Sequence, residues 1–154
     1  MSKMSPFFRQ KHRAAINCKY LSYTLPNGGN IRLPMLHVRL SRENLSLSTI
    51  GLVDSGSTTT FVPLELAEIL SLPIETESSA VGAGGSFNNT IRRVDISLLK
   101  GNSVFAEFPN FPVYVPTDAG RVPYVVLGRD SIFRKFDITF RENQRRFILR
   151  GSKK

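Results

Sequence analysis

Cysteine, histidine and long apolar stretches are scarce in this chain of 154 residues. Its one cysteine, Cys18, excludes a disulfide within the chain, so we expect a reducing compartment. The two histidines, His12 and His37, form no zinc-binding pattern. No stretch approaches the roughly 18 apolar residues of a membrane span, and residues 1–18 lack the apolar core of a secretory signal. We therefore expect a cytoplasmic protein that requires no metal or organic cofactor.

Acidic side chains are scarce at both ends of the chain. Residues 1–24 carry five basic and no acidic side chains, and residues 141–154 carry six basic and one acidic. Residues 25–140 are nearly balanced, with ten basic and eleven acidic side chains. Basic ends can attract nucleic acid or an anionic surface, or they can simply keep a protein in solution. No aromatic platform or helix-turn-helix pattern accompanies them, which favours the second interpretation and leaves nucleic-acid binding as an alternative.

Long helical patterns are missing as well. From residue 20 onward, short apolar or β-branched runs alternate with turn residues, which is typical of an all-β barrel or sandwich. Only residues 64–70, after Pro63, and residues 131–133 suggest short helices. We expect a folded domain at residues 20–150, between a flexible basic arm (1–19) and a basic tail (151–154). The strands are expected at residues 20–25, 31–40, 45–53, 58–62, 74–81, 87–99, 104–108, 111–115, 122–127, 136–140 and 146–149.

The residue best placed for chemistry is Asp54, at the end of an apolar strand. It is followed by Ser55, Gly56 and Ser57. Glycine allows a tight turn, and a small hydroxyl can hydrogen-bond the nearby backbone, so such a loop can hold a carboxylate in place. Taken alone, Asp-Ser-Gly is also a common surface turn.

Three segments together resemble the retropepsin-like family of aspartic peptidases. Leu-Val-Asp-Ser-Gly-Ser at residues 52–57 resembles the catalytic loop, and Val-Val-Leu-Gly-Arg-Asp at 125–130 resembles the second signature. Between them, Gly-Ala-Gly-Gly-Ser-Phe at 82–87 resembles the tip of the flap, a hairpin that closes over the substrate. The resemblance spans about residues 31–149 and implies a small closed β-barrel with one or two short helices.

The resemblance also implies a function and the residues that perform it. The chain would be an aspartic endopeptidase that acts on peptides or proteins, with Asp54 as its single catalytic carboxylate. Because the chemistry needs two aspartates, the active form would be a homodimer. The remaining site residues would be loop supports (Ser55, Gly56, Ser57, Leu127 and Gly128) and the substrate-binding flap (Gly82, Ala83, Gly84 and Gly85).

One departure from the viral pattern leaves a second function open. Thr58 stands where viral members often carry an acid that pairs with the arginine after the second glycine. Arg129 would then need another partner, such as Asp130 or Asp137. The alternative to a peptidase is a module of the same fold that binds peptides and dimerises without cutting.

Overall fold

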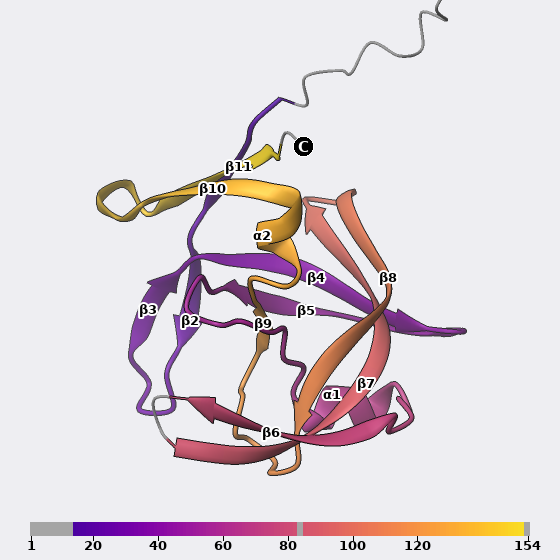
Figure 1. Cartoon of the computed structure of the whole chain (residues 1–154). Coiled ribbons are helices and arrows are strands. Elements are labelled where there is room, and N and C mark those ends of the chain that lie inside the picture. The colour runs from indigo at the N-terminus through magenta and orange to yellow at the C-terminus, as the bar shows by residue number, and fades with distance from the viewer. Residues whose placement is uncertain (1–13, 83–84, 153–154) are drawn as a thin grey trace, which may run out of the picture.

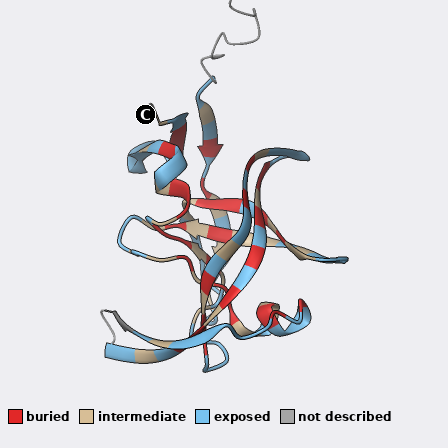
Figure 2. Cartoon of the chain, turned by 45° about the vertical axis from the view of Figure 1, so that its right-hand side comes forward, coloured by how far each residue is buried: buried red, intermediate tan, exposed pale blue. Residues whose placement is uncertain are grey.

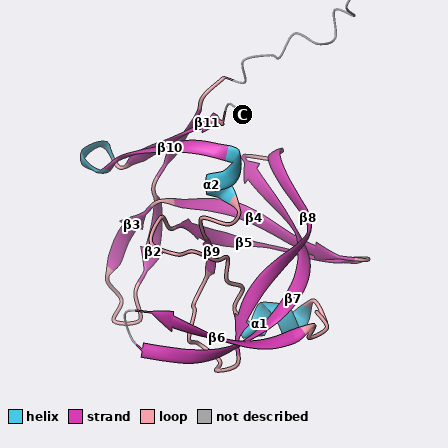
Figure 3. Cartoon of the chain, viewed as in Figure 1, coloured by secondary structure: helices cyan, strands magenta, loops and turns pink. Residues whose placement is uncertain are grey.

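The computed structural model describes residues 14–82 and 85–152, which fold almost entirely into strands (Figure 1; Figure 3). The all-β class predicted from the sequence is confirmed. Within these residues there are two short helices, α1 (Leu64–Ile69) and α2 (Ile132–Lys135). The strands are β1 (Ile16–Lys19), β2 (Leu21–Thr24), β3 (Asn30–Leu33), β4 (Met35–Arg42), β5 (Leu45–Val53), β6 (Thr76–Gly82), β7 (Gly85–Lys100), β8 (Ser103–Pro116), β9 (Val125–Leu127), β10 (Phe136–Arg141) and β11 (Arg146–Gly151).

The largest sheet has the strand order β6-β7-β4-β5-β9, and β8 pairs with β7. Within the described residues this sheet does not close on itself, so the expected closed barrel is an open, bent sheet. The opening is spanned by Phe61, which forms single bridges with Tyr114 of β8 and Val126 of β9. Strands β5 and β9 run parallel, with Val53 opposite Leu127. Two segments far apart in sequence therefore end side by side, directly before Asp54 and Gly128.

Strands β7 and β8 form one long hairpin of 16 and 14 residues. We expected the second strand to break at Pro109 and Asn110, but β8 continues through them. The register of the pair shifts between Val94 and Ile96. Asn110 has a φ of 47°, and its N–H donates to Asp95 Oδ1 at 2.6 Å. The turn residues are thus absorbed as a bulge that bends the strand instead of ending it.

A second sheet joins the two ends of the described chain, in the order β1-β11-β10. Ile16 lies opposite Leu149 and Cys18 opposite Phe147, which is fully buried. The predicted flexible arm, residues 1–19, therefore extends too far along the chain, because Ile16–Lys19 are fixed as a strand by their pairing with β11. Similarly, Gly151 of the predicted tail belongs to β11. Residues 1–13 and 153–154 lie outside the described part.

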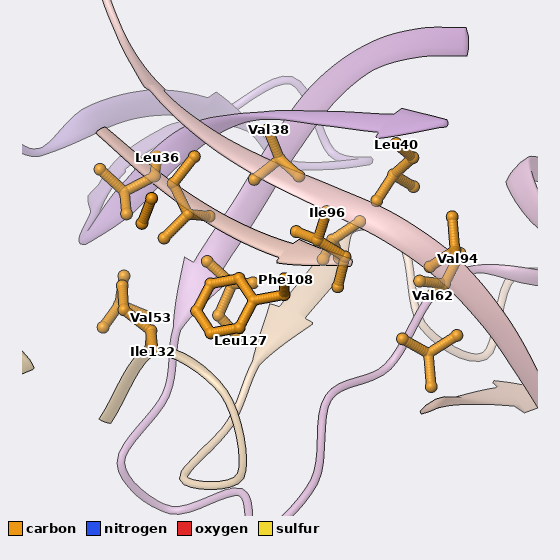
Figure 4. Packing of buried hydrophobic residues seen from close by; sticks show 14 of the residues in the cluster. Leu36, Val38, Leu40, Val53, Val62, Val94, Ile96, Phe108, Leu127 and Ile132 are labelled. Atoms are coloured by element: carbon orange, nitrogen blue, oxygen red, sulfur yellow. The ribbon is translucent and has the colours of Figure 1, made fainter. Parts of the chain in front are cut away.

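The core lies between the bent sheet and the segments that cross it (Figure 2; Figure 4). On β4, Leu36 and Val38 are buried while His37 between them is exposed, as the alternation predicts. Leu127 and Ile132 add fully buried side chains from β9 and α2. Each such side chain stabilises the fold by about 1.5–3 kcal/mol relative to exposure. Val53, directly before Asp54, is 3% exposed, so the strand that leads into the Asp54 loop is also anchored in the core.

Candidate active site

Asp54 follows the last residue of β5 and is held by backbone bonds on both sides. Its N–H donates to Leu127 O at 3.0 Å, and the N–H of Val53 donates to Pro34 O at 2.9 Å. Leu127 ends β9, so the parallel pairing of β5 and β9 extends one bond into the loop. The backbone that carries the carboxylate is thus fixed by strands rather than by the loop itself. Leu127, predicted as a loop support, lies next to Asp54 as expected.

The Asp54 carboxylate is half-buried and oriented by its own loop. The Gly56 N–H donates to Asp54 Oδ1 at 2.9 Å, and the Ser57 N–H donates to Asp54 O at 3.2 Å. A Cβ at residue 56 would lie 3.2 Å from Oδ1 and would crowd it. Within residues 14–82 and 85–152, the other oxygen, Oδ2, has no hydrogen-bond partner. One oxygen is therefore held while the other remains available to a water molecule or a second carboxyl group.

The two serines of the loop differ in their contacts. Ser57 Oγ donates to Thr59 O at 2.6 Å and closes the turn that follows Asp54. Ser55 is exposed, and its hydroxyl makes no hydrogen bond within the part of the chain that the structure describes. The structure therefore brings Ser57 into the support of the loop. A supporting role for Ser55 stays a prediction.

Gly128 lies where two chain segments cross. We call residues 54–61 together with 128–131 the crossing. A Cβ at residue 128 would lie 2.1 Å from Thr59 O and 2.9 Å from Ser57 O, which no side chain tolerates. The Arg129 N–H donates to Ser57 O at 2.8 Å across the same approach. The glycine of the second signature is thus required because the catalytic loop passes against its α-carbon.

A buried polar network at the crossing was missed by the sequence reasoning. Thr60 is fully buried and its hydroxyl donates to Asp130 Oδ1 at 2.7 Å, while its N–H donates to Asp130 Oδ2 at 3.2 Å. The same hydroxyl accepts from the Gly128 N–H at 3.3 Å and lies 2.7 Å from Ser131 Oγ. Bonds to a carboxylate are stronger than neutral ones. Both residues lie close to the two signatures in the sequence, since Asp130 ends the second one and Thr60 follows the first by three positions.

Arg129 does not obtain the partner that we expected. Its side chain is exposed, and within the described ranges it forms no ion pair. Asp130 is instead engaged by Thr60, and Asp137 Oδ1 accepts from Ser152 Oγ at 3.3 Å. The proposal that either acid replaces the missing partner is therefore wrong. The guanidinium of Arg129 is left at the surface beside the loop.

The predicted flap corresponds to the hairpin of β6 and β7. We call residues 76–82 and 85–91 the flap hairpin. Gly82 and Gly85 face each other at its end, and Gly85 has a φ of 102°, which favours glycine. Ala83 and Gly84, the predicted tip, lie outside the described residues. Near this end the hairpin contacts the crossing, because the Phe87 ring lies 5.9 Å from that of Phe61.

Tyr124 is a second residue near Asp54 that the sequence did not single out. It directly precedes β9, and its ring meets that of Tyr23 at 5.3 Å and 87°. Burial, then the neighbouring Tyr23 and Asp54, raise the pKa of the Tyr124 hydroxyl above its usual value. The carboxylate therefore has an aromatic neighbour that stays uncharged at neutral pH.

Asp54 lies in neither of two surface pockets found on the chain. One, of about 370 Å³, is lined by residues that include Arg42, Glu43 and Arg93, near the opposite end of β5. The other, of about 310 Å³, lies between β1, β8 and β10. Across the described ranges, no three His, Cys, Asp or Glu side chains gather as metal ligands would. No helix there is long and apolar enough to cross a membrane.

Comparison with solved structures finds chains to which this one is similar. The protease of EIAV, complexed with the inhibitor HBY-793, is 18% identical over 73% of this chain and 92% of that chain, with a TM-score of 0.50. A retropepsin-like aspartic protease from Rickettsia conorii is 15% identical over 88% and 89%, with a TM-score of 0.48. The retroviral protease-like domain of Ddi1 from Leishmania major is 18% identical over 72% and 84%, at 0.43.

Sequence comparison adds no relative. No protein-family model matches the chain, and no curated protein matches it. At 18% identity, the likeness to the EIAV protease concerns the fold and not the activity. The chain has a retropepsin-like fold.

Proposed function

We propose that the chain is an aspartic endopeptidase that works as a homodimer, with one Asp54 from each subunit. The observation that carries this proposal is the Asp54 loop itself. One carboxylate oxygen is fixed by the Gly56 N–H at 2.9 Å, and the backbone is tied to Leu127. A retropepsin-like fold surrounds that loop. A carboxylate that is held by its scaffold rather than by a counter-charge suits acid–base chemistry.

The chemistry requires two carboxyl groups that share one proton. Two carboxylates within a few ångströms of each other cannot both ionise, so the pair titrates as a unit. The ionised member takes a proton from water, and the resulting hydroxide attacks the carbonyl carbon of the peptide bond. The protonated member donates to the carbonyl oxygen, and a proton then passes to the leaving amine as the C–N bond breaks. Asp54 Oδ1 is held by Gly56, so Oδ2 is the oxygen available to face the partner.

The second carboxyl group must come from another copy of the chain. Asp130 is engaged by Thr60, at the crossing. Asp118 lies in an exposed turn at Thr117–Gly120, where Gly120 N–H donates to Glu65 Oε1 at 2.9 Å. Asp130 is not followed by a glycine, and Asp118 lacks the hydroxyl residue that follows Asp54.

The flap hairpin would bind the substrate through its backbone. An extended peptide presents alternating N–H and C=O groups that a neighbouring strand can pair. Gly82 and Gly85, which face each other in the flap hairpin, carry no side chain that would obstruct such pairing. Phe87 against Phe61 links this part of the hairpin to the crossing. A clamp of this kind selects extended peptides and needs no cofactor.

Cleavage of a denatured protein mixture at several pH values tests the proposal. Wild type should cut, and Asp54→Asn should lose activity by at least about 10³-fold, because the amide cannot take up the proton. Asp118→Asn is the matched control, since it changes an exposed turn aspartate in the same way and should retain full activity. Sedimentation at the assay concentration must show a dimer for each variant.

Two results would contradict the proposal. Activity that survives in Asp54→Asn would belong to another residue or to a contaminant. A stable wild-type dimer that binds peptides without cutting them would favour the peptide-binding module. If neither cleavage nor peptide binding occurs and nucleic acid binds with steep salt dependence, the basic ends carry the function instead.

A further inference from the structure

Most of the hairpin formed by β2 and β3 lies outside the stretch, residues 31–149, that resembles the retropepsin-like family. In Figure 1 it descends beside the end of β5, next to the catalytic loop. Tyr23 pairs with Ile31, and Leu21 pairs with Leu33, so these four side chains share one face of the hairpin. Ser22, on the opposite face, is exposed. The hairpin is therefore amphipathic, with its apolar face distinct from its polar one.

The apolar face of this hairpin reaches the catalytic residue through one aromatic contact. The rings of Tyr23 and Tyr124 meet edge to face at 5.3 Å. Tyr124 is adjacent to β9, which pairs with β5, and Asp54 is close enough to influence its hydroxyl. Tyr23 therefore contacts the aromatic neighbour of Asp54, although Tyr23 is 31 positions earlier in the chain than Asp54.

This face is incompletely covered in the single chain. Ile31 is 38% exposed, and Leu21, Tyr23 and Leu33 are only half-buried. All four side chains of the face are without charge. Uncovered apolar surface beside a site favours an apolar ligand group, because burial removes that surface from water. Four residues are too few to form a stable protein interface, which buries about 800 Å² on each partner.

We propose that Tyr23 is a specificity-determining residue, whose ring forms with Tyr124 an apolar wall that accepts a large apolar substrate side chain beside the bond to be cut. This inference rests on the proposed peptidase function and deepens it. An extended peptide directs alternate side chains to opposite sides, so one position of the substrate would meet this wall. The β2–β3 hairpin would thus add a wall to the cleft from a part of the chain that precedes the shared fold.

Cleavage-site profiling tests the inference. Wild type, Tyr23→Ala, Tyr23→Phe and Ser22→Ala would each digest the same peptide mixture, and mass spectrometry would give the residue preference at each position around the cut. Tyr23→Ala should change the ratio of kcat/KM between large and small apolar side chains by about tenfold or more at one position. Tyr23→Phe keeps the ring and should stay within about twofold, as should the matched control Ser22→Ala.

The other outcomes separate this inference from the proposed function. If Tyr23→Ala cleaves with an unchanged residue preference, Tyr23 does not determine specificity, and the proposed peptidase function is unaffected. A uniform loss at all positions, together with weaker dimerisation, would make the hairpin a subunit contact and would also overturn the wall. If wild type and all variants fail to cut, the proposed function and this inference fail together. Should Tyr23→Ala unfold, Tyr23→Leu keeps an apolar side chain and must still change the profile at the same position.

Discussion

The crossing and the flap hairpin are organised differently. At the crossing, Asp54 is bonded to Leu127, and Thr60 is bonded to Gly128 and Asp130, so the bonds join segments about seventy residues apart. The flap hairpin is held by a ladder between neighbours in sequence, from Thr76 opposite Ile91 to Gly82 opposite Gly85. The first can form only when the whole domain folds, whereas the second can open locally. The proposed peptidase would need this difference, because its carboxylate must be held rigidly while its clamp opens for the substrate.

The two regions also differ in how completely their buried polar groups are paired. The Thr60 hydroxyl has Asp130, Gly128 and Ser131 around it. Asn89 of the flap hairpin is 1% exposed, yet within the described residues its Oδ1 has no hydrogen-bond partner. Its Nδ2 makes one long bond to Phe87 O, at 3.4 Å. The buried Thr60 hydroxyl therefore stabilises the crossing, while the Asn89 amide of the flap hairpin contributes little or costs free energy.

The largest effect should come from filling the space at Gly128. Gly128→Ala should lower the free energy of unfolding by about 3 kcal/mol, because its Cβ would lie 2.1 Å from a backbone oxygen that cannot move aside. Urea denaturation measures the change. Gly151→Ala is the matched control, since a Cβ there meets nothing within 4 Å, and it should stay within about 0.5 kcal/mol. Equal stability of the two variants would show that the crossing is not tightly packed.

The next effect concerns the hydroxyl of Thr60. Thr60→Val keeps the shape but leaves a buried carboxylate oxygen of Asp130 and the Gly128 N–H without a partner. We expect a loss of about 2 kcal/mol, typical of a hydrogen bond to a charged group. Thr60→Ser keeps the hydroxyl and removes one methyl group, for about 1 kcal/mol. If the valine variant were more stable than the serine variant, the hydrogen bonds of Thr60 would not stabilise the crossing, and the contrast with the flap hairpin would be wrong.

Tyr20 provides a third case, a hydroxyl beside a carboxylate in the terminal sheet. Burial, followed by a hydrogen bond to Glu142 and the charge of that residue, raises the pKa of Tyr20 to about 12, and its side chain is 3% exposed. An unfolded tyrosine loses its proton near pH 10, so between about pH 10 and 12 the unfolded state releases a proton that the folded state keeps. The stability is complete below pH 10 and falls as the pH rises, by about 1 kcal/mol at pH 11.

The variant Tyr20→Phe isolates this effect. The variant has no hydroxyl to titrate, so its free energy of unfolding should not show this decline above pH 10. The wild-type and variant curves should therefore converge as the pH rises. Urea denaturation between pH 9 and 11.5 gives both curves. Parallel curves would mean that the hydroxyl titrates normally in the folded protein. In that case a buried hydroxyl–carboxylate pair would be special to the crossing.

What the sequence could predict depends on the distance over which each feature is determined. The strand before Asp54, the turn at Gly56 and the helix after Pro63 are local patterns, and the structure contains the strand, the turn and a helix at Leu64–Ile69. The resemblance added the neighbouring position of Leu127 and Gly128, which local patterns alone do not give. The retropepsin-like fold could therefore be expected before any coordinates were known.

The unpredicted features all depend on contacts between distant segments. Strand β1 is recognisable only through its pairing with β11, because four residues with a lysine and an asparagine have no strand signal of their own. Thr60 meets Asp130, and Tyr23 meets Tyr124, only after the strands have assembled. Pro109 and Asn110 look like a strand end until Asp95 accepts a bond from the bulge. Sequence patterns carry no information about such partners.

The smallest expected effect is at Asn89, and it gives the comparison its sharpest test. Asn89→Leu removes a buried oxygen that lacks a partner and one long bond, so the free energy of unfolding should stay within about 1 kcal/mol of wild type. Asn88→Leu is the matched control on the exposed neighbour, expected within about 0.5 kcal/mol. Both are measured by urea denaturation beside Thr60→Val. A loss at Asn89 as large as that at Thr60 would mean that its Oδ1 is bonded in solution, and the flap hairpin would then be held as firmly as the crossing.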